Sequence, residues 1–283
     1  MLGSFWDYNI HAGFGMIFNG PGERRISMKQ KKRRKGISSG VFRGIRWFVK
    51  RLYPKIRLEG TENLPDGPCI VAGNHAQMNG PIACELYLPG DRAIWCAGEM
   101  MKLRDVPAYA YADFWSGKPG GVRWFYKGLS YVIAPLAVCV FHNARTIAVY
   151  RDARGAGTFR NTVRRLEEGA KVVIFPEGKG KRNRIVNQFQ DKFVDVARLY
   201  HRRTGEALPF VPMYVAPRLK TLYFGKPVLY QPKEPAALER QRVVEALMRA
   251  VTDLAEGLPV HTVVPYDNIP TKHYPTNKPQ EAE

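Results

Sequence analysis

Two short apolar runs, each stopping at a turn that carries a polar side chain, constrain the fold of this chain most. The first occupies residues 69–72 and is followed by Gly73-Asn74-His75; the second occupies residues 172–175 and is followed by Pro176-Glu177-Gly178. Such runs are typical of strands buried on both faces of a parallel sheet. In open α/β sheets, ligands bind beyond the carboxyl ends of these strands. A histidine there can act as a general base near neutral pH, although it can also simply close a turn by hydrogen bonding.

Short apolar runs and helical periodicity alternate along the rest of the chain. We expect strands at 55–58, 69–72, 146–150, 172–175 and 210–215, extended chain at 222–224 and 228–230, and helices at 41–52, 81–88, 158–169, 189–200 and 235–257. Thr158 is the expected cap of its helix. This alternation predicts an α/β fold, with a mixed sheet flanked by helices.

The expected organisation is a basic N-terminal arm over residues 1–40, an α/β domain over 41–262 and a C-terminal tail over 263–283. The residues from 259 onward are rich in Pro, Asn and Thr, which predicts that they drape over the domain or fray. Residues 91–127 are rich in aromatic side chains. We expect most of these to be core, although a lipid-facing or acyl-binding wall would have the same composition.

A formal net charge of +19 at pH 7 implies an anionic partner. Residues 29–35 are almost all Lys or Arg, and the segment 41–52 then repeats apolar side chains at helical spacing with basic ones on its other faces. A basic amphipathic helix of this kind is typical of segments that lie on anionic lipid. Nucleic-acid binding and an ordinary packed helix are the alternatives. Because no nucleic-acid-binding module follows the arm, we expect an anionic membrane surface as the partner and no nucleic acid.

The sequence predicts a peripheral membrane protein on the cytoplasmic face. No stretch is expected to be long enough to span a membrane, because the most apolar run, Tyr131 to Phe141, is interrupted by Pro135. We expect that run to be a buried helix or one that dips into a membrane interface. Asp7 within the mildly apolar N-terminus argues against a signal peptide. The four cysteines have no CxxC spacing, which predicts neither a zinc site nor a redox motif and favours a reduced cytosolic setting.

Four ordered motifs resemble those of the glycerolphosphate and lysophosphatidate acyltransferase superfamily, which moves a fatty acyl group from a thioester to a hydroxyl. Asn74-His75 matches the first motif, Tyr150-Arg151 the second, Phe175-Pro176-Glu177-Gly178 the opening of the third and Val211-Pro212-Met213 the fourth. Flanking segments at 58–65 and 224–227 extend the resemblance over residues 55–230. It implies an acyltransferase-like αβ sandwich.

The chain departs from this family at two motifs. The first motif has an aspartate five residues after the histidine, and this chain has Gly80 there. The acid orients the imidazole in the family, so we expect another acid to substitute, with Glu85, Glu99 and Asp113 as candidates, or catalysis to be impaired. The third motif continues with threonine and arginine in the family. Here it continues as Lys179-Gly180-Lys181-Arg182, a cationic loop that can hold a phosphate or can be a solvated loop.

The resemblance implies His75 as the general base that takes a proton from an acceptor hydroxyl, whose oxygen then attacks the thioester of acyl-coenzyme A or an acyl-carrier protein. It also implies sites for the phosphorylated acceptor, at Arg151, Glu177, Gly178, Lys179, Lys181 and Arg182. No metal and no further cofactor are expected. Because the aspartate is absent, a non-catalytic relative that binds lipid or a thioester carrier remains the alternative function.

Overall fold

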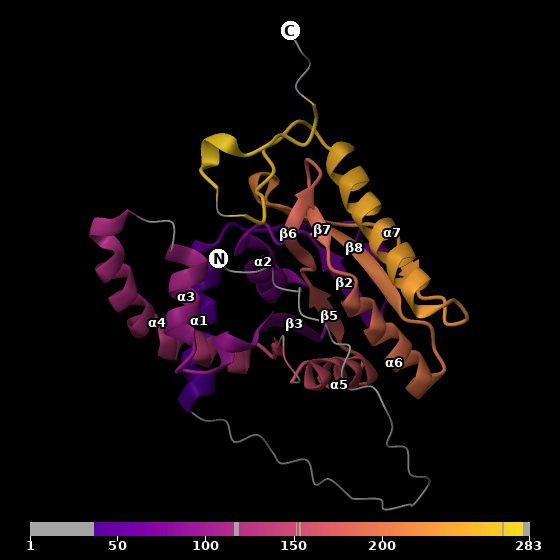
Figure 1. Ribbon diagram of the computed structural model, residues 1–283, viewed down its shortest axis with the longest axis horizontal. Helices are drawn as coiled ribbons and strands as arrows, with labels where there is room; N and C mark the ends of the chain where they lie inside the picture. Colours follow the sequence, from indigo (N-terminus) through magenta and orange to yellow (C-terminus); the bar gives the residue numbers. More distant parts are fainter. Residues whose placement is uncertain (1–36, 116–118, 151, 153, 268, 280–283) are drawn as a thin grey trace, which may run out of the picture.

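The computed structural model describes residues 37–115, 119–150, 152, 154–267 and 269–279, with the side chains of residues 37, 38, 113, 114, 181 and 182 left out (Figure 1). The run of basic residues at 29–35 lies outside the described part. The strands are β1 (Arg57–Glu59), β2 (Cys69–Gly73), β3 (Arg92–Ala97), β4 (Ile147–Val149), β5 (Lys171–Ile174), β6 (Glu177–Arg182), β7 (Asn187–Phe189), β8 (Pro209–Ala216), β9 (Thr221–Phe224) and β10 (Val228–Leu229). The α-helices are α1 (Ile37–Leu52), α2 (Asn79–Tyr87), α3 (Val106–Ala110), α4 (Arg123–Asn143), α5 (Gly155–Glu167), α6 (Asp195–Thr204) and α7 (Ala236–Glu256).

An eight-stranded mixed sheet forms the centre of the molecule, so the predicted fold class is confirmed. Its order is β1-β9-β8-β2-β5-β3-β4, with β10 added beside β8. The strands β8, β2, β5, β3 and β4 all run parallel, whereas β9 and β10 are antiparallel to β8. The two apolar runs that end in Asn74-His75 and Pro176-Glu177 are therefore neighbours in register, with Val71 opposite Val173.

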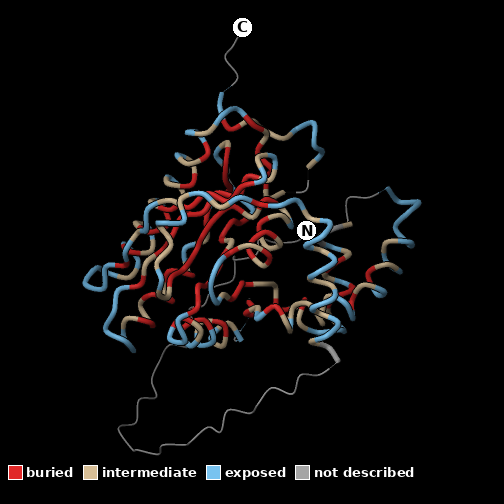
Figure 2. The backbone as a smooth tube through the Cα atoms, turned by 180° about the vertical axis from the view of Figure 1, so that it is seen from behind, coloured by how far each residue is buried: buried red, intermediate tan, exposed pale blue. Residues whose placement is uncertain are grey.

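Helices cover both faces of this sheet, which is why its central strands are continuously apolar. Alternate residues of each strand point to opposite sides. Ile70, Val172 and their neighbours pack against the apolar faces of α5, α6 and α7, whereas Cys69, Val71 and Val173 pack on the other side with α2. Figure 2 shows the buried strands in red between these layers.

A lobe made of α1, α3 and α4 stands to one side of the sheet (Figure 1). Helix α1 joins the lobe from before β1. The rest of the lobe leaves the carboxyl end of β3 through the 3₁₀ helix Gly98–Met101 and returns along α4 to β4. Its small apolar cluster, centred on Met100, Val106, Ala110 and Ala134, is separate from the two clusters on the sheet.

The helix α4 corrects two expectations. The helical segment Gly120–Asn143 is long and apolar enough to cross a membrane by length and composition, so the prediction that no stretch has that length was wrong. Pro135 lies inside the helix without ending it. Of the two alternatives expected for the run 131–141, the buried helix was wrong, because only 11% of the most apolar window is buried.

Three local predictions also change. Thr158 lies inside α5, which begins at Gly155, and its hydroxyl donates to the carbonyl of Ala148 instead of capping the helix. The helix expected at 189–200 begins only at Asp195, because residues 187–189 form β7. The segment 179–182, expected as a cationic loop, belongs to strand β6, which pairs antiparallel with β7 in a separate two-stranded sheet.

Candidate functional site

The carboxyl ends of β2, β5 and β8 bring the candidate residues together. These three strands are adjacent and parallel, so the segments that follow them meet at one edge of the sheet. His75 follows β2, Glu177 follows β5, and the 3₁₀ helix Pro217–Leu219 follows β8. This is the edge at which α/β sheets bind ligands.

Asn74 fixes the end of β2 to the fourth-motif strand. Its side-chain amide donates to the carbonyl of Val215 at 3.0 Å, and its carbonyl oxygen accepts from the Val215 amide at 2.7 Å. Both residues are buried, where an unpaired backbone group would cost about 1–3 kcal/mol. The asparagine therefore holds the backbone that enters the histidine turn.

Glu177 holds the same turn from the other side. Its Oε2 accepts a hydrogen bond from the backbone amide of His75 at 2.6 Å, and its Oε1 accepts one from the amide of Asn187 at 2.9 Å. The side chain is only 4% exposed. Hydrogen bonds to a carboxylate are stronger than those between neutral groups, so this contact ties the first-motif turn to the β6–β7 hairpin. The structure thus joins His75 and Glu177, two of the predicted site residues.

The turn after His75 places a backbone carbonyl beside its ring. Ala76 and Gln77 have φ values of 46° and 56°, in the left-handed region that residues other than glycine rarely adopt. This conformation turns the carbonyl oxygen of Gln77 toward Nδ1 of His75, with which it forms a short hydrogen bond. Because a carbonyl oxygen only accepts, Nδ1 carries the proton and Nε2 carries the lone pair.

The imidazole is half-buried between two aromatic rings. Phe175 lies with its ring centroid 5.0 Å from that of His75, and Tyr266, from the C-terminal segment, packs edge-on at 5.8 Å. Burial lowers the pKa of His75 to about 4, against the opposing effect of the hydrogen bond to Gln77. The ring is therefore neutral at pH 7, as a general base must be before it takes a proton.

Gly80 does not leave a space that an aspartate could occupy. It lies in the first turn of α2, where a Cβ atom would stand 2.7 Å from the carbonyl oxygen of His75 and 2.7 Å from Cε1 of Phe175. Real Cβ atoms are essentially never that close to another heavy atom. The His75 carbonyl also accepts a hydrogen bond from the Gly80 amide at 3.1 Å. The backbone of the histidine turn has closed over the position of the missing acid.

Neither of the two candidate substitutes with described side chains, Glu85 and Glu99, lies at the imidazole. Glu85 on α2 accepts from Arg46 at 3.1 Å and from Arg92 at 3.4 Å. Glu99 follows β3, and β5 lies between β3 and β2 in the sheet. The side chain of Asp113 is outside the described part. Within the described residues, no carboxylate accepts a hydrogen bond from the His75 ring.

The predicted phosphate-binding residues are only partly described. Arg151 lies outside the described residues, and so do the side chains of Lys181 and Arg182. Lys179 is exposed on β6. The carbonyl of Gly178 accepts from the side chain of Asn187 at 3.1 Å. No group of three or more His, Cys, Asp or Glu side chains suited to a metal ion occurs in the described part of the chain.

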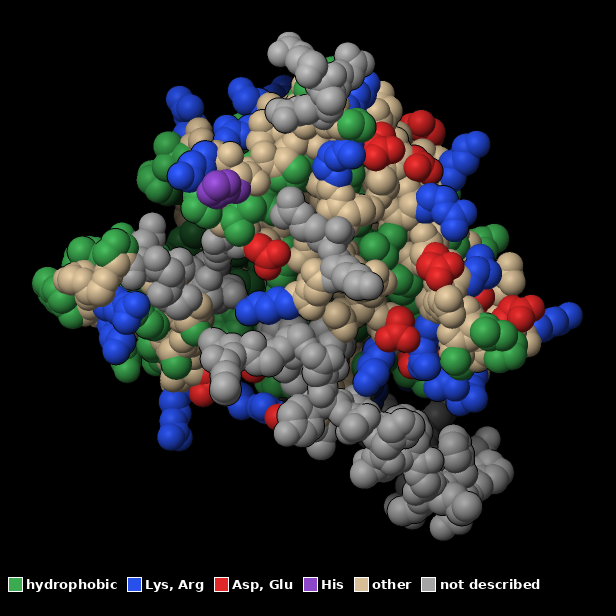
Figure 3. Space-filling model, turned by 45° about the horizontal axis from the view of Figure 1, so that its top comes forward, with side chains coloured by type: hydrophobic (Ala, Val, Ile, Leu, Met, Phe, Trp, Pro, Cys, Tyr) green, Lys and Arg blue, Asp and Glu red, His purple; other side chains and the backbone are tan. Residues whose placement is uncertain are grey.

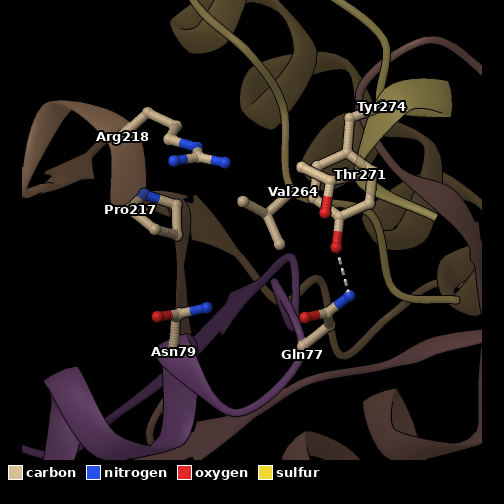
Figure 4. Close-up of a pocket in the computed structure, with 7 residues that line it drawn as sticks. All are labelled: Gln77, Asn79, Pro217, Arg218, Val264, Thr271 and Tyr274. Atoms are coloured by element: carbon tan, nitrogen blue, oxygen red, sulfur yellow. Dashed lines mark hydrogen bonds between the residues drawn. The ribbon is translucent and has the colours of Figure 1, made fainter. Parts of the chain in front are cut away.

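A polar hollow of about 290 Å³ lies beside the histidine turn (Figure 4). Its lining includes Gln77, Asn79, Thr271 and Tyr274, with Arg218 directed toward them from the far side. The Gln77 amide donates to the Tyr274 hydroxyl at 2.8 Å, which ties the histidine turn to the C-terminal segment. Arg218 is the cation of this lining, so the hollow can accept an anion.

The sequence analysis missed Gln77, Arg218, Tyr266 and Tyr274. Arg218 comes two residues after the fourth-motif strand, and the rule that ligands bind beyond strand carboxyl ends could have identified it. The two tyrosines lie in the expected tail. No local pattern signals them, because only the return of that segment over the sheet edge brings them to the site (Figure 1).

Comparisons with known proteins give a family match and matches to solved structures. A family model described as acyltransferase matches residues 55–216, more than half of the chain. The 1-acyl-sn-glycerophosphate (LPA) acyltransferase PlsC from Thermotoga maritima is similar in structure, with a TM-score of 0.43 and 22% sequence identity over 77% of this chain and 80% of that chain. No curated protein matches the chain by sequence.

Proposed function

The chain belongs to the acyltransferase family, and we propose that it is an O-acyltransferase that moves a fatty acyl group from a thioester to a hydroxyl of a phosphorylated glycerolipid-type acceptor. The donor is acyl-coenzyme A or an acyl-carrier protein. The reaction takes place at an anionic membrane surface, on the cytoplasmic face. The hydrogen bond between Nδ1 of His75 and the carbonyl of Gln77 carries the proposal.

That hydrogen bond gives His75 the tautomer a general base needs without an aspartate. Nε2 takes the proton from the acceptor hydroxyl, the oxygen attacks the thioester carbonyl, and the sulfur leaves as a thiolate that recovers the proton from His75. Such help from a positioned base contributes about 10² to 10⁴ in rate. A carbonyl stabilises the resulting imidazolium less than a carboxylate would, so turnover is expected to be slower than with a first-motif aspartate.

Glu177 acts here as a residue that positions His75, because its buried carboxylate accepts a hydrogen bond from the His75 backbone amide. The acceptor phosphate is held by Arg151 and the cations of the 179–182 segment. Gly178 is not assigned to it, because this glycine is buried with the side chain of Gln190 packed against it. Arg218 joins the cations, since it faces the polar hollow next to the histidine turn. The guanidinium group suits phosphate because it can donate two parallel hydrogen bonds.

Thioester consumption by the purified full chain on anionic liposomes tests the proposal. Long-chain acyl-coenzyme A and acyl-carrier protein serve as donors, with glycerol 3-phosphate and lysophosphatidate as acceptors. We expect His75→Ala to lose activity by about 10²-fold or more while its unfolding curve stays like that of the parent. His201→Ala, on the remote helix α6, is the matched control and should keep full activity. Full activity in His75→Ala would refute the mechanism.

Arg218→Ala separates the two substrates. We expect it to raise the KM for a phosphorylated acceptor by about tenfold, the loss of one charged contact, with little change in the KM for the donor. The exposed Arg202 on α6 provides the matched control, Arg202→Ala. A rise in the donor KM alone would instead assign Arg218 to the donor.

A non-catalytic lipid-binding protein is the second candidate function. Two observations favour it: Gly80 occupies the position of the aspartate, and the pKa of His75 is lowered to about 4, which makes the imidazole a weak base. Turnover with any acyl donor that depends on His75 would exclude it. Liposome binding without turnover, over both donors and both acceptors, would favour it.

A further inference from the structure

The helix α4 exposes apolar side chains along one whole side. A surface helix normally presents polar residues to solvent. Here the exposed side carries Trp124, Phe125, Tyr131, Val132 and Leu136, with Trp124 76% and Val132 75% exposed. The opposite side, with Ser130 and Ala134, is buried against the rest of the lobe.

The neighbouring helix α1 extends this apolar surface. It packs against α4 and exposes Val41, Trp47, Phe48 and Leu52, with Trp47 70% exposed. Figure 3 shows hydrophobic side chains gathered at this end of the molecule with basic side chains beside them. We define the exposed apolar residues of the two helices as the α1–α4 surface. Exposed apolar side chains gathered on neighbouring helices mark protein or membrane interaction sites.

The charges around this surface identify what covers it. Neither α1 nor α4 contains Asp or Glu, and both carry exposed cations, at Arg43, Lys50, Arg51, Arg123 and Lys127. A second copy of the chain would bring like charges together without acids to pair them. In an anionic bilayer, the apolar residues would contact the hydrocarbon chains and the cations would bind the lipid phosphates. The exposed tryptophans and tyrosine also suit the boundary between lipid and water.

The contacts of α4 decide how it meets the bilayer. Near its start, Tyr126 stacks on Trp115 at 5.5 Å and Lys127 lies 5.6 Å over the ring of Tyr111. At its end, Nε2 of His142 is 2.9 Å from the carbonyl of Met101. Both ends of the helix are therefore held by the same lobe. A membrane-spanning arrangement would separate these ends to opposite sides of the bilayer and break the contacts.

We propose that the α1–α4 surface inserts into one leaflet, with α4 lying in the plane of the membrane as an interfacial helix rather than crossing it. The inference rests on the proposed function for its membrane partner and adds the part of the fold that enters the lipid. It makes the lobe of α1, α3 and α4, and not the basic arm alone, the anchor of the protein.

Vesicle co-sedimentation of the full chain tests this proposal. The vesicles are phosphatidylcholine with phosphatidylglycerol, and the variant is Trp124→Glu with Val132→Glu. Both side chains are exposed, so the variant should fold like the parent, which circular dichroism and thermal unfolding check. We expect its vesicle affinity to fall about tenfold or more, because two charges replace apolar groups at the interface. Leu238→Glu, at an exposed leucine on the remote helix α7, is the matched control and should bind normally.

Three outcomes would overturn the inference. The first is unchanged vesicle binding by the α4 variant. The second is a homodimer in lipid-free solution, seen by light scattering, that the α4 variant dissociates. The third is resistance of the membrane-bound protein to alkaline carbonate, which releases interfacial helices but not spanning ones. His75→Ala should bind vesicles like the parent, so loss of turnover and loss of membrane insertion are measured separately.

Discussion

Restoring the family aspartate by Gly80→Asp should damage this protein instead of improving it. The acid that orients the histidine in the first motif is absent, and its reintroduction would be the obvious route to higher activity. In the structure, however, a Cβ atom at this position meets the backbone oxygen of His75 at 2.7 Å and Cε1 of Phe175 at the same distance. The backbone oxygen cannot rotate away as a side chain can.

The magnitude follows from this overpacking. Gly80→Ala adds only the Cβ atom and should lower the free energy of unfolding by about 1–3 kcal/mol. At an ordinary helical glycine, the same replacement by alanine stabilises the protein by up to about 1 kcal/mol. Gly157→Ala, in the first turn of α5 with nothing within 4 Å of its Cβ, is the matched control and should be neutral or stabilising. Gly80→Asp should cost more than Gly80→Ala, because a carboxylate also enters a buried position.

Urea denaturation of the four proteins, with thioester turnover measured in parallel, checks this reasoning. We expect Gly80→Asp to lose both stability and activity, because relief of the contact moves the His75 backbone that Glu177 and the Gly80 amide hold. Adding Phe175→Leu to Gly80→Ala removes the contact of the new Cβ atom with the phenylalanine ring but not its contact with the His75 carbonyl oxygen. The double variant should therefore recover only part of the lost stability. A Gly80→Asp protein as stable as the parent and at least as active would refute the account of this turn.

Three further predictions concern the same turn. The pKa of His75 lies near 4 in the folded protein, against about 6.5 for an ordinary histidine. Between these pH values the unfolded chain binds a proton that the folded one does not, so the free energy of unfolding should fall by up to about 3 kcal/mol as pH drops from 6.5 to 4. Denaturation curves of His75→Gln should lack this part of the fall. Glu177→Gln should lower the free energy of unfolding by about 1–3 kcal/mol and also lower kcat, since an amide offers one acceptor oxygen for the two backbone amides of His75 and Asn187. An unchanged urea midpoint would contradict this prediction. Asn74→Ala should lower the free energy of unfolding by about 1–3 kcal/mol for each backbone group of Val215 left unpaired. Hydrogen exchange at the Val215 amide should become faster, and slower exchange than in the parent would argue against this.

The sequence alone predicted the elements on which the site stands. The runs 69–72, 172–175 and 210–215 are strands β2, β5 and β8, because strands covered on both faces must be apolar throughout and stop where polar side chains begin. That pattern was sufficient to place His75 and Glu177 at the ends of strands, whereas the sheet order made these strands neighbours. The α/β fold class followed from the alternation of strands with helices, and it is confirmed.

Sequence reasoning did not reach the contacts that decide how the site works. The acceptor for Nδ1 of His75 is a backbone carbonyl, which every residue possesses, so no residue type could signal it. Glu85 was one of three acids among which the sequence could not choose, and α2 directs it toward Arg46 and Arg92. The apolar residues of α4 match those of a buried helix in composition. Only the arrangement of the lobe leaves them exposed, because burial depends on which segments return to cover a face and not on the sequence of that face.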